Sequence, residues 1–474
     1  MKRTARYSNL LLCLMSLLLV AAMAGCGGGG GGGGGGSPSA PSGNDGSGPI
    51  SQGVIEVDLA SSQPTSLKQG LVDGLGGYSG PNPAMDTANG YISALKPKSW
   101  RFSQLDIYNF VVRDYQYDSR FGTSIVVNLQ DIFNTKYGKP IKVAPICFQP
   151  SCFTSFDSLR QAWVSTLEQA LIDTSAFHIN YFDLLAEADI GSFENVSPDQ
   201  IYLLLKDAYG LVKSHRPDAK IVGPSDSTFD ASVYQNLLSN LVTDSLHLDA
   251  ISWHELDNDP DVISGHVETL KSFFVLFPQI CVPTCPEIHI NEYQGENTMF
   301  IPGPAVGWLK QLEAAKIDQA NRACWGGDPG SSINYDTCWY GFEGMLTPDN
   351  SSPQALYWIY KYYADLGDSR FSTQNSISKI AAISGQLSDG RVGVLLGNYG
   401  LGSALFQLKL NHFESSSAQI DIYRLSNNLN QVVALPQVEL LKSLSLDAQN
   451  ASLSIDMSEV LPGEAYWVVI TPLP

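Results

Sequence analysis

The chain has 474 residues, of which 28 are Lys or Arg and 47 are Asp or Glu, so its formal net charge is −19 at pH 7. This acidic balance argues against a nucleic-acid partner, because phosphate binding requires clustered basic residues. Hydrophobic residues make up 44% and charged residues 16% of the sequence, which is typical of globular proteins. The length suits one barrel-sized domain plus a smaller one.

The first 25 residues predict an export signal. Basic residues precede an apolar stretch at 10–22 that is too short for a comfortable membrane span. The four residues that end at Cys26 resemble the bacterial lipobox, so we expect cleavage before Cys26 and its lipidation; an ordinary cleaved signal is the alternative. We therefore expect the protein to be exported and anchored by lipid to a bacterial membrane. The outer membrane is favoured, with the protein on its periplasmic or cell-surface side.

Residues 26–50 predict a linker that follows the lipidated Cys26. The run from Gly27 to Gly36 is uninterrupted, and the remaining residues offer almost nothing to bury. A Gly-rich chain of this length spans roughly 25 Å, enough to hold a domain clear of a membrane surface. A phosphate-binding loop is disfavoured, since no strand precedes the run and no Lys ends it.

Six further cysteines form three pairs that are close in sequence. An oxidising compartment favours bridging, so we predict three short-loop disulfides. Zinc binding is the alternative, and the spacings do not match its usual motifs. No metal and no cofactor is predicted. The pairs are Cys147 and Cys152, Cys281 and Cys285, and Cys324 and Cys338.

From about residue 70, short β-rich runs alternate with longer amphipathic segments, which predicts βα units around a parallel sheet. Eight strand positions favour an α/β fold of the (β/α)8 TIM-barrel type over residues 51–370, with an open doubly wound sheet as the alternative. The expected strands are Leu71–Tyr78, Ser99–Phe102, Ile141–Ile146, Ile179–Ala186, Lys220–Gly223, Leu248–Trp253, Glu287–Asn291, and either Ala323–Trp325 or Cys338–Gly341. The expected helices are Ser158–Ile172, Pro198–Ser214, Ala231–Val242, Asp261–Leu276, Ala305–Ala320 and Pro353–Leu366.

Beyond residue 370 the pattern changes to short alternating runs without a helix. These runs predict a C-terminal antiparallel β-sandwich domain over residues 371–474. An alternating strand at Val54–Leu59, before the barrel, is a candidate to join that sandwich. The expected strands are Ile380–Leu387, Val392–Tyr399, Leu405–Leu410, Ala418–Arg424, Val438–Lys442, Ala451–Ile455 and Ala465–Ile470.

Two glutamates end apolar strands of the predicted barrel. Glu187 ends the fourth strand and Glu292 ends the seventh, where the loops of such a barrel form a cleft. An unpaired carboxylate is costly to bury, which makes these acids better candidates than surface ones. Two carboxyl groups roughly 5 to 5.5 Å apart support retaining glycoside hydrolysis. A structural ion pair is the competing interpretation of each.

Seven segments carry a resemblance to a known family: Trp100–Phe102, Ile179–Asp189, Lys220–Pro224, Ile251–His254, Ile288–Tyr293, Gly341–Thr347 and Pro353–Tyr357. In this order they resemble glycoside hydrolase family 39 of the clan A barrels. The resemblance implies a (β/α)8 barrel with a β-sandwich, a carbohydrate substrate, Glu187 as acid/base and Glu292 as nucleophile. Two positions depart from the family: Ala186 stands where an Asn bonds the sugar 2-hydroxyl, and the pattern after strand six reads His254-Glu255-Leu256.

Other residues are candidates to bind the substrate. Arg101 and His254 are expected at strand tops, where a cation or an imidazole can bond the nucleophile or a sugar hydroxyl. Asn291 precedes the expected nucleophile. Aromatic rings can stack on sugar faces, although core packing is an equal alternative for each. The aromatic candidates are Trp253, Tyr293, Trp325 and Trp339.

The predicted function is a retaining glycoside hydrolase that acts on an extracellular or periplasmic polysaccharide or oligosaccharide. β-Xylosidase-like action and endo-cleavage of an exopolysaccharide both remain open. The alternative, prompted by Ala186, is a carbohydrate-binding lipoprotein on a glycosidase scaffold that has lost catalysis. The acidic stretch Asp257–Asp261 is expected to be a solvated loop rather than a calcium site, because Val262 and Pro260 do not fit the calcium-loop pattern. No oligomeric state is predicted.

Overall fold

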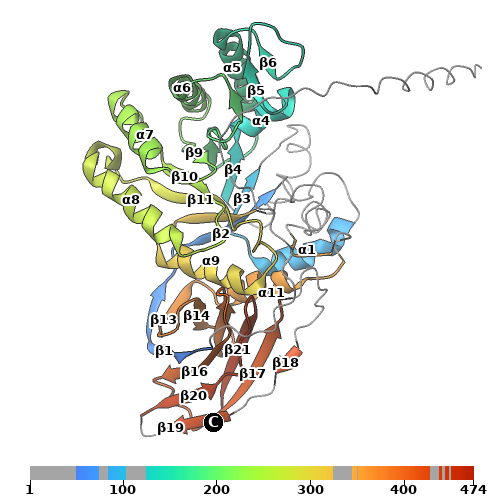
Figure 1. Ribbon diagram of the computed structural model, residues 1–474, viewed down its shortest axis with the longest axis vertical. Coiled ribbons are helices and arrows are strands. Elements are labelled where there is room, and N and C mark those ends of the chain that lie inside the picture. The colour runs from blue at the N-terminus through green and yellow to red at the C-terminus, as the bar shows by residue number, and fades with distance from the viewer. Residues whose placement is uncertain are drawn as a thin grey trace, which may run out of the picture. The chain divides into compact units, whose positions relative to one another are not determined.

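The computed structural model describes residues 50–73, 84–102, 124–323, 344–347, 349, 351–427, 437–439, 443–447 and 450–473. Within them eight parallel strands close into a barrel, as predicted, and each pairs with its neighbours in chain order (Figure 1). This closure is consistent with a TIM barrel and excludes the open doubly wound sheet. The barrel strands are β2 (Lys68–Asp73), β3 (Ser99–Phe102), β4 (Ser124–Asn128), β7 (Tyr181–Asp183), β9 (Lys220–Asp226), β10 (Ala250–Glu255), β11 (Glu287–Tyr293) and β12 (Gln319–Arg322).

Two of the predicted barrel strands were wrong. The third is β4, and the segment predicted in its place forms β5 (Ile141–Val143), which pairs with β6 (Cys152–Phe153) and β8 (Phe193–Glu194) in a separate three-stranded sheet. The eighth is β12, four residues earlier than the nearer candidate. β12 is polar in sequence, yet all four of its residues are buried. A search for apolar runs therefore overlooks it.

Helices follow the barrel strands, and their starts agree with local capping signals. Ser155 caps α5 through a reciprocal bond pair with Ser158, and Ser197 caps α6 in the same way with Gln200. The two helices pack together, and the Trp163 indole donates to the carbonyl of Leu204 at 3.0 Å. The helices are α1 (Ala84–Leu95), α4 (Leu129–Tyr137), α5 (Phe156–Asp173), α6 (Pro198–His215), α7 (Ala231–Thr243), α8 (Val262–Leu276), α9 (Pro302–Ala314), α11 (Ala355–Asp365) and the short 3-10 helix η3 (Pro278–Cys281).

The remaining strands form two five-stranded sheets with a shared apolar core, a sandwich-like arrangement. The second sheet is antiparallel throughout, but in the first β1 pairs parallel with β16, which corrects the expectation of purely antiparallel pairing. The sequence analysis also missed β13 and β19. In sheet order, the first sheet is β13 (Ser369–Asn375), β1 (Ser51–Pro64), β16 (Ala404–Asn411), β20 (Ser452–Asp456) and β19 (Ser443–Asp447), and the second is β14 (Ile380–Gln386), β15 (Val392–Asn398), β21 (Ala465–Leu473), β17 (Ser417–Leu425) and β18 (Gln437–Glu439).

Helix α9 packs against β14 and β15, which joins the barrel to these sheets (Figure 1). The approach is close enough to require glycine, since a Cβ on Gly303 would lie 2.2 Å from the carbonyl oxygen of Asn398. Lys379 adds ion pairs to Asp259 at 2.8 Å and to Asp261 at 2.6 Å. The acidic loop at 257–261 thus contacts the sandwich-like part through two of its three aspartates.

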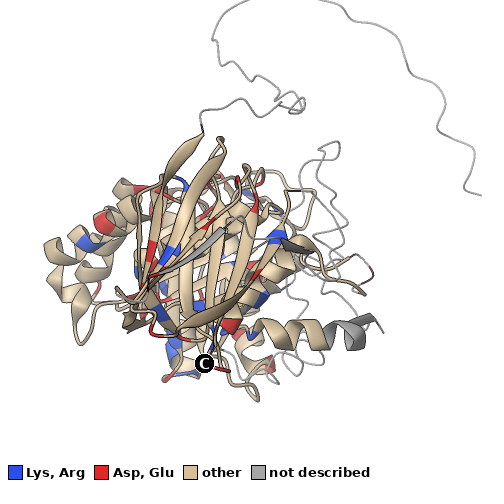
Figure 2. Cartoon of the chain, turned by 90° about the horizontal axis from the view of Figure 1, so that it is seen from below, with Lys and Arg blue, Asp and Glu red and all other residues tan. Residues whose placement is uncertain are grey.

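Two of the three predicted disulfides are present, Cys147–Cys152 and Cys281–Cys285. The predicted pair of Cys324 and Cys338 lies outside the described residues, as do the export signal, Cys26 and the linker up to residue 49. Over the described ranges, no helix is both long and apolar enough to span a membrane. In Figure 2 the basic residues are scattered over the visible elements rather than gathered on one of them.

Candidate active site

Two glutamates approach each other at the carboxyl ends of the barrel strands. Glu292 is the second-last residue of β11, and Glu187 follows β7 on the next loop. Glu187 has a φ of 50°, and its N–H donates to the carbonyl of Ser225, which has a φ of 56°, at 2.9 Å. Left-handed backbone at non-glycine residues is costly and tends to persist where function requires it.

His254, near the end of β10, lies between the two carboxylates. A register shift after Trp253 pairs His254 with Glu292 across the neighbouring strands. The His254 Nδ1 is 3.2 Å from Glu187 Oε1 and 3.7 Å from Glu292 Oε2. One nitrogen of His254 and one carboxylate oxygen of each glutamate all lie within 4.8 Å of one another. The Glu187 side chain is 23% exposed and that of Glu292 only 8%. Glu187 is therefore the more accessible acid.

Arg101 on β3 forms an ion pair with Glu292. Its Nη1 donates to Glu292 Oε1 at 2.7 Å, and its Nε donates to Asp183 Oδ2 at 3.0 Å. Arg101 and Asp183 are both fully buried. Burial alone would lower the pKa of Arg101, but the charges of Asp183 and Glu292 outweigh it and raise that pKa. The guanidinium is a fixed positive charge that favours the ionised form of Glu292.

A buried polar network supports Asp183 beneath this contact. Ser225 Oγ and Asn291 Nδ2 donate to Asp183 at 2.7 and 3.0 Å, and Asn291 Nδ2 also lies 2.9 Å from Ser225 Oγ. Ser252 Oγ is 2.7 Å from Ser225 Oγ. Asn291 was expected to bind substrate, but it is fully buried here and supports the Arg101 partner instead.

The two glutamates and His254 titrate as an interacting set. Burial raises the pKa of Glu292, and the positive charges of His254 and Arg101 only partly offset it. Burial acts upward on the pKa of Glu187 too, but the hydrogen bond and charge of His254 outweigh it, so that pKa is lowered. For His254 burial acts downward, yet Glu292 and Glu187 together raise its pKa. A proton on His254 is thus stabilised by both carboxylates.

Asp226, the last residue of β9, is a further acid that the sequence analysis did not select. Asp226 is buried, with only 6% of the residue exposed. Burial and the nearby charge of Asp189 raise the pKa of Asp226 to about 7. Asp189 itself accepts the N–H and the hydroxyl of Ser227 at 2.9 and 2.7 Å. Asp226 is therefore partly protonated near neutral pH and can donate as well as accept a hydrogen bond.

The backbone around Ala186 is held by amides from the β4–α4 region. Gln130 Oε1 accepts the N–H of Ala186 at 3.0 Å, and its Nε2 donates to the Ala186 carbonyl. Asn128 Nδ2 donates to the Leu185 carbonyl at 2.7 Å. Both amides are buried and engaged with the main chain. They position the Glu187 loop, and neither replaces the amide that the family resemblance expects at position 186.

Two of the aromatic candidates pack against the helices around the barrel, Trp253 against Tyr234 of α7 and Tyr293 against Trp308 of α9, which corrects the expectation that they stack on sugars. Trp253 and Tyr293 are both fully buried. The hydroxyl of Tyr293 donates to that of Tyr360 at 3.1 Å. Burial of area accounts for both rings. The other two candidates, Trp325 and Trp339, lie outside the described residues.

The arrangement is suited to proton transfer and nucleophilic attack. Glu187, His254 and Glu292 are close enough to bind a metal ion as well. However, the guanidinium of Arg101, 2.7 Å from Glu292, already neutralises that carboxylate and disfavours a second cation. A partly exposed acid beside a buried, charge-paired acid matches the requirements of a proton donor and a nucleophile.

No family model matches the chain. A curated protein, the 3-O-alpha-D-galactosyl-alpha-L-arabinofuranosidase of Bifidobacterium longum subsp. longum, is 29% identical over 162 residues. The match covers 33% of this chain and 12% of that protein, so the chain spans only a small part of this relative's length.

Solved structures share the fold over most of the chain. A protein from Neocallimastix frontalis has a TM-score of 0.69 at 19% identity and covers 90% of this chain and 100% of its own. The GH39 enzyme from Xanthomonas axonopodis pv. citri has a TM-score of 0.59 at 13% identity, covering 89% and 97%. A monomeric beta-xylosidase from Caulobacter crescentus has a TM-score of 0.58 at 12% identity, covering 89% and 100%. The shared fold and the short sequence match support a relation to the glycoside hydrolases.

Proposed function

We propose that this protein is a retaining glycoside hydrolase that cleaves a polysaccharide or oligosaccharide by double displacement. The observation that carries the proposal is the pair of Glu187 and Glu292. A carboxylate oxygen of one lies within 4.8 Å of a carboxylate oxygen of the other, and Arg101 donates a hydrogen bond to Glu292. Retaining enzymes hold their carboxyl groups about 5 to 5.5 Å apart, whereas inverting enzymes need about 6.5 to 9.5 Å to admit a water molecule.

Glu292 is the nucleophile in this proposal and Glu187 the acid/base. Glu292 attacks the anomeric carbon while Glu187 gives its proton to the leaving glycosidic oxygen, which forms a glycosyl-enzyme. Glu187 then takes a proton from water, whose oxygen displaces Glu292 from the sugar. Arg101 favours this assignment, because its direct bond stabilises the carboxylate of Glu292 and orients one of its oxygens.

The proton donor role requires a protonated Glu187, and the contact with His254 lowers the pKa of Glu187. A sugar oxygen placed against Glu187 would replace His254 at 3.2 Å as its hydrogen-bond partner. Burial, the largest influence on this group, would then raise its pKa toward that of a general acid. His254, whose pKa is raised, can supply the proton as the contact breaks.

Ala186 favours a second candidate function, carbohydrate binding without turnover. A hydrogen bond to the sugar 2-hydroxyl strengthens in the transition state and contributes several kcal/mol in glycosidases. Within the described residues, Gln130 and Asn128 lie next to this backbone, but their amides are already bonded to it.

Asp226 offers a carboxyl group at the same end of the barrel. For the hydrolase, we propose Asp226 as a substitute partner for a sugar hydroxyl.

The glycan class that we propose to test first contains arabinose or xylose. The reasons are the short match to an arabinofuranosidase and the fold shared with a beta-xylosidase. Residues 51–474 should be screened against aryl pentosides, arabinogalactan and arabinoxylan. Hydrolysis should give a product that first appears with the anomeric configuration of the substrate, as read by NMR. Initial inversion would reject the double-displacement mechanism, and glycan binding without any product would favour the binding protein.

We also propose that the chain is exported and lipid-anchored through Cys26. Support comes from the signal-like residues 1–25, the Gly-rich tether and the two disulfides of the folded part. Cells that express the full chain should incorporate labelled palmitate into the wild type and into Cys13→Ser, but not into Cys26→Ser. Labelling of Cys26→Ser would reject the anchor.

A further inference from the structure

Two strongly exposed apolar side chains stand on a loop that a disulfide closes. The loop from Cys147 to Cys152 follows β5, and within it Phe148 is 92% exposed, while the preceding Ile146 is 70% exposed. A third apolar residue, Ile190, is 56% exposed on the loop that carries Glu187. We call these three residues the apolar rim. Exposed apolar surface is a mark of binding sites, and these three residues stand on two loops that one small sheet joins.

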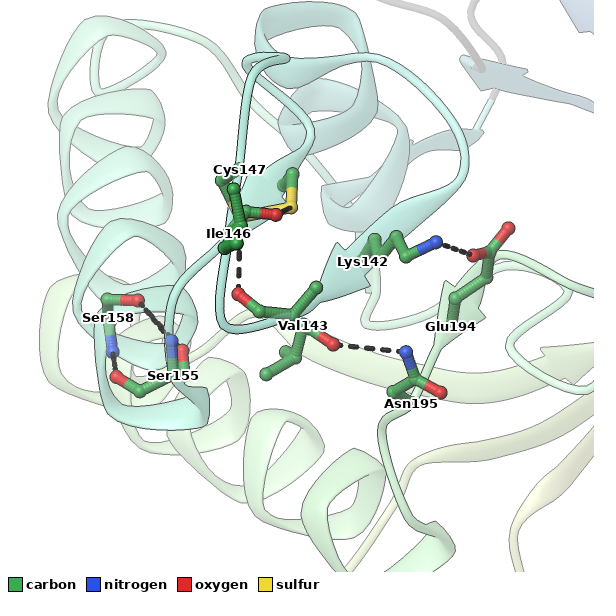
Figure 3. Close-up of a disulfide and its surroundings, with 10 residues drawn as sticks. Lys142, Val143, Ile146, Cys147, Ser155, Ser158, Glu194 and Asn195 are labelled. Carbon is green, nitrogen blue, oxygen red and sulfur yellow. Dashed lines mark hydrogen bonds and ion pairs between the residues drawn. A yellow bond between two sulfur atoms is a disulfide. The ribbon is translucent and has the colours of Figure 1, made fainter.

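The apolar rim is built on a rigid lobe. β5, β6 and β8 form the small parallel sheet that joins the segment between α4 and α5 to the loop after β7. Lys142 pairs with Glu194 at 3.2 Å, and Asn195 Nδ2 donates to the carbonyl of Val143 at 3.1 Å (Figure 3). The disulfide between Cys147 and Cys152, the first residue of β6, restricts the loop further. Little conformational entropy remains to be lost when a ligand binds there.

Several contacts connect this lobe to the acid/base. The Ile190 N–H donates to the carbonyl of Glu187 at 3.3 Å, and two residues later the Ser192 carbonyl accepts the N–H of Ile141 in β5 at 2.9 Å. On the other side, the positive charge of Lys139 acts on the carboxylate of Glu187. Both loops therefore leave the candidate site on the side of the proton donor.

We propose that the apolar rim binds the part of a glycan chain that leaves with the proton donor, in other words the aglycone side of the substrate. This inference rests on the proposed function and assigns a chain of several sugars, rather than a single residue, to the leaving-group side. The ring of Phe148 offers an exposed face to the C–H face of a sugar, and Ile146 and Ile190 extend the apolar surface.

The test compares Phe148→Ala with Leu401→Ala, which removes an equally exposed side chain from the loop between β15 and β16. The kcat/KM for arabinoxylan or arabinogalactan is measured and divided by that for a p-nitrophenyl pentoside. This ratio should fall about tenfold in Phe148→Ala, as expected for a lost aromatic contact. It should recover in Phe148→Trp and stay at the wild-type value in Leu401→Ala.

Binding is measured separately by electrophoresis in gels that contain the same polysaccharides. Phe148→Ala should lose retardation that Leu401→Ala keeps. If both variants match the wild type in binding and in the ratio, the apolar rim proposal is overturned. A concentration-dependent dimer that disappears in Phe148→Ala, with glycan binding unchanged, also overturns it. If the wild type hydrolyses no glycan, the proposed function fails, and the gel experiment still decides the apolar rim.

Discussion

Both ends of the barrel carry an acid cluster built on the same three strands, partly exposed where the strands begin and buried where they end. β7, β9 and β11 contribute Tyr181, Lys220 and Glu287 where they begin, and Asp183, Ser225 and Glu292 where they end. At the first end the Glu287 carboxylate lies 2.6 Å from Lys220 Nζ, 2.7 Å from the Tyr181 hydroxyl and 2.9 Å from His289 Nε2. These contacts outweigh burial, which acts upward, and place the pKa of Glu287 well below its ordinary range.

The cluster at the carboxyl ends is organised differently. Among the described residues Glu187 has one side-chain hydrogen-bond partner, His254 at 3.2 Å, and its own backbone is left-handed. Within the described residues, buried His254 Nε2 and Arg101 Nη2 have no hydrogen-bond partner. A carboxylate with three donors keeps its charge and serves structure, whereas one with a single long contact can gain and lose a proton. Glu287 thus has the contacts of a structural acid, and Glu187 has those that the proposed catalytic role requires.

The difference between the two clusters predicts unequal effects on kcat when one acid at each end of β11 is neutralised. Glu292→Gln removes the nucleophile and should lower kcat by about 10⁴-fold or more. Glu287→Gln keeps the same strand and size, and should change kcat by less than about tenfold. Steady-state kinetics on an aryl pentoside measure kcat for both variants. Equal losses in the two variants would mean that Glu292 acts only through folding, and azide rescue of Glu292→Ala would support the nucleophile role.

Glu187→Gln should have the next largest effect. Loss of general acid catalysis lowers the rate by about 10²- to 10⁴-fold, and the loss should shrink for leaving groups that need no proton. Activity should also lose its decline at alkaline pH, because that decline reports the deprotonation of the acid. The measurement is a series of aryl pentosides with different leaving groups. The assignment is wrong if Glu187→Gln slows all members of the series equally and leaves the pH profile unchanged.

Asp183→Asn tests the network that supports Arg101. The substitution leaves a fully buried guanidinium with one acidic partner, and breaking such a pair costs about 3 to 5 kcal/mol of unfolding free energy. As a control, Asp249→Asn weakens the partly exposed contact of Asp249 with Lys213 at 3.7 Å and should cost less than about 1 kcal/mol. Urea denaturation of both variants measures the difference, and a similar stability of the two would contradict the role of the network.

The overall plan of the fold was readable from the alternation of strand and helix signals, and the errors have a physical origin. β12 escaped the prediction because Gln319, Asn321 and Arg322 are polar in sequence but find partners inside the barrel, including a 3.3 Å contact between the first two side chains. The segment at 141–143 has strand character, but strand character alone cannot tell which sheet a strand joins. The parallel pairing of β1 with β16 depends on partners more than 300 residues away.

The candidate site was partly readable as well. The criterion of an acid at the end of an apolar strand selects Glu187 and Glu292. The fourth strand, expected over Ile179–Ala186, in fact ends at Asp183, so the strand-end acid there is Asp183 and Glu187 lies on the loop that follows. The positions of Arg101 and His254 followed from strand order. The hydrogen bonds of Asn291 to Asp183 could not be predicted, because they depend on which face of β11 turns inward after its register shift. The raised pKa of Asp226 likewise depends on burial that only the folded chain provides.

The smallest expected effect is an opposite pH dependence of stability at the two ends. The pKa of Glu287 is lowered from 4.5, so its contribution is present above pH 4.5 and is lost as the pH falls through the lower value in the folded chain. The pKa of His254 is raised from 6.5, so its contribution to the free energy of unfolding is full below pH 6.5 and is lost as the pH rises through the folded-state value.

Glu287→Gln should therefore lower the free energy of unfolding by about 2 kcal/mol at neutral pH and by less in acid. His254→Asn should lower it more in mild acid than in base. Urea denaturation across the pH range measures both. Parallel pH profiles of the two variants would contradict the distinction between the clusters, because a carboxylate with three donors and a histidine between two carboxylates must respond to protons with opposite sign.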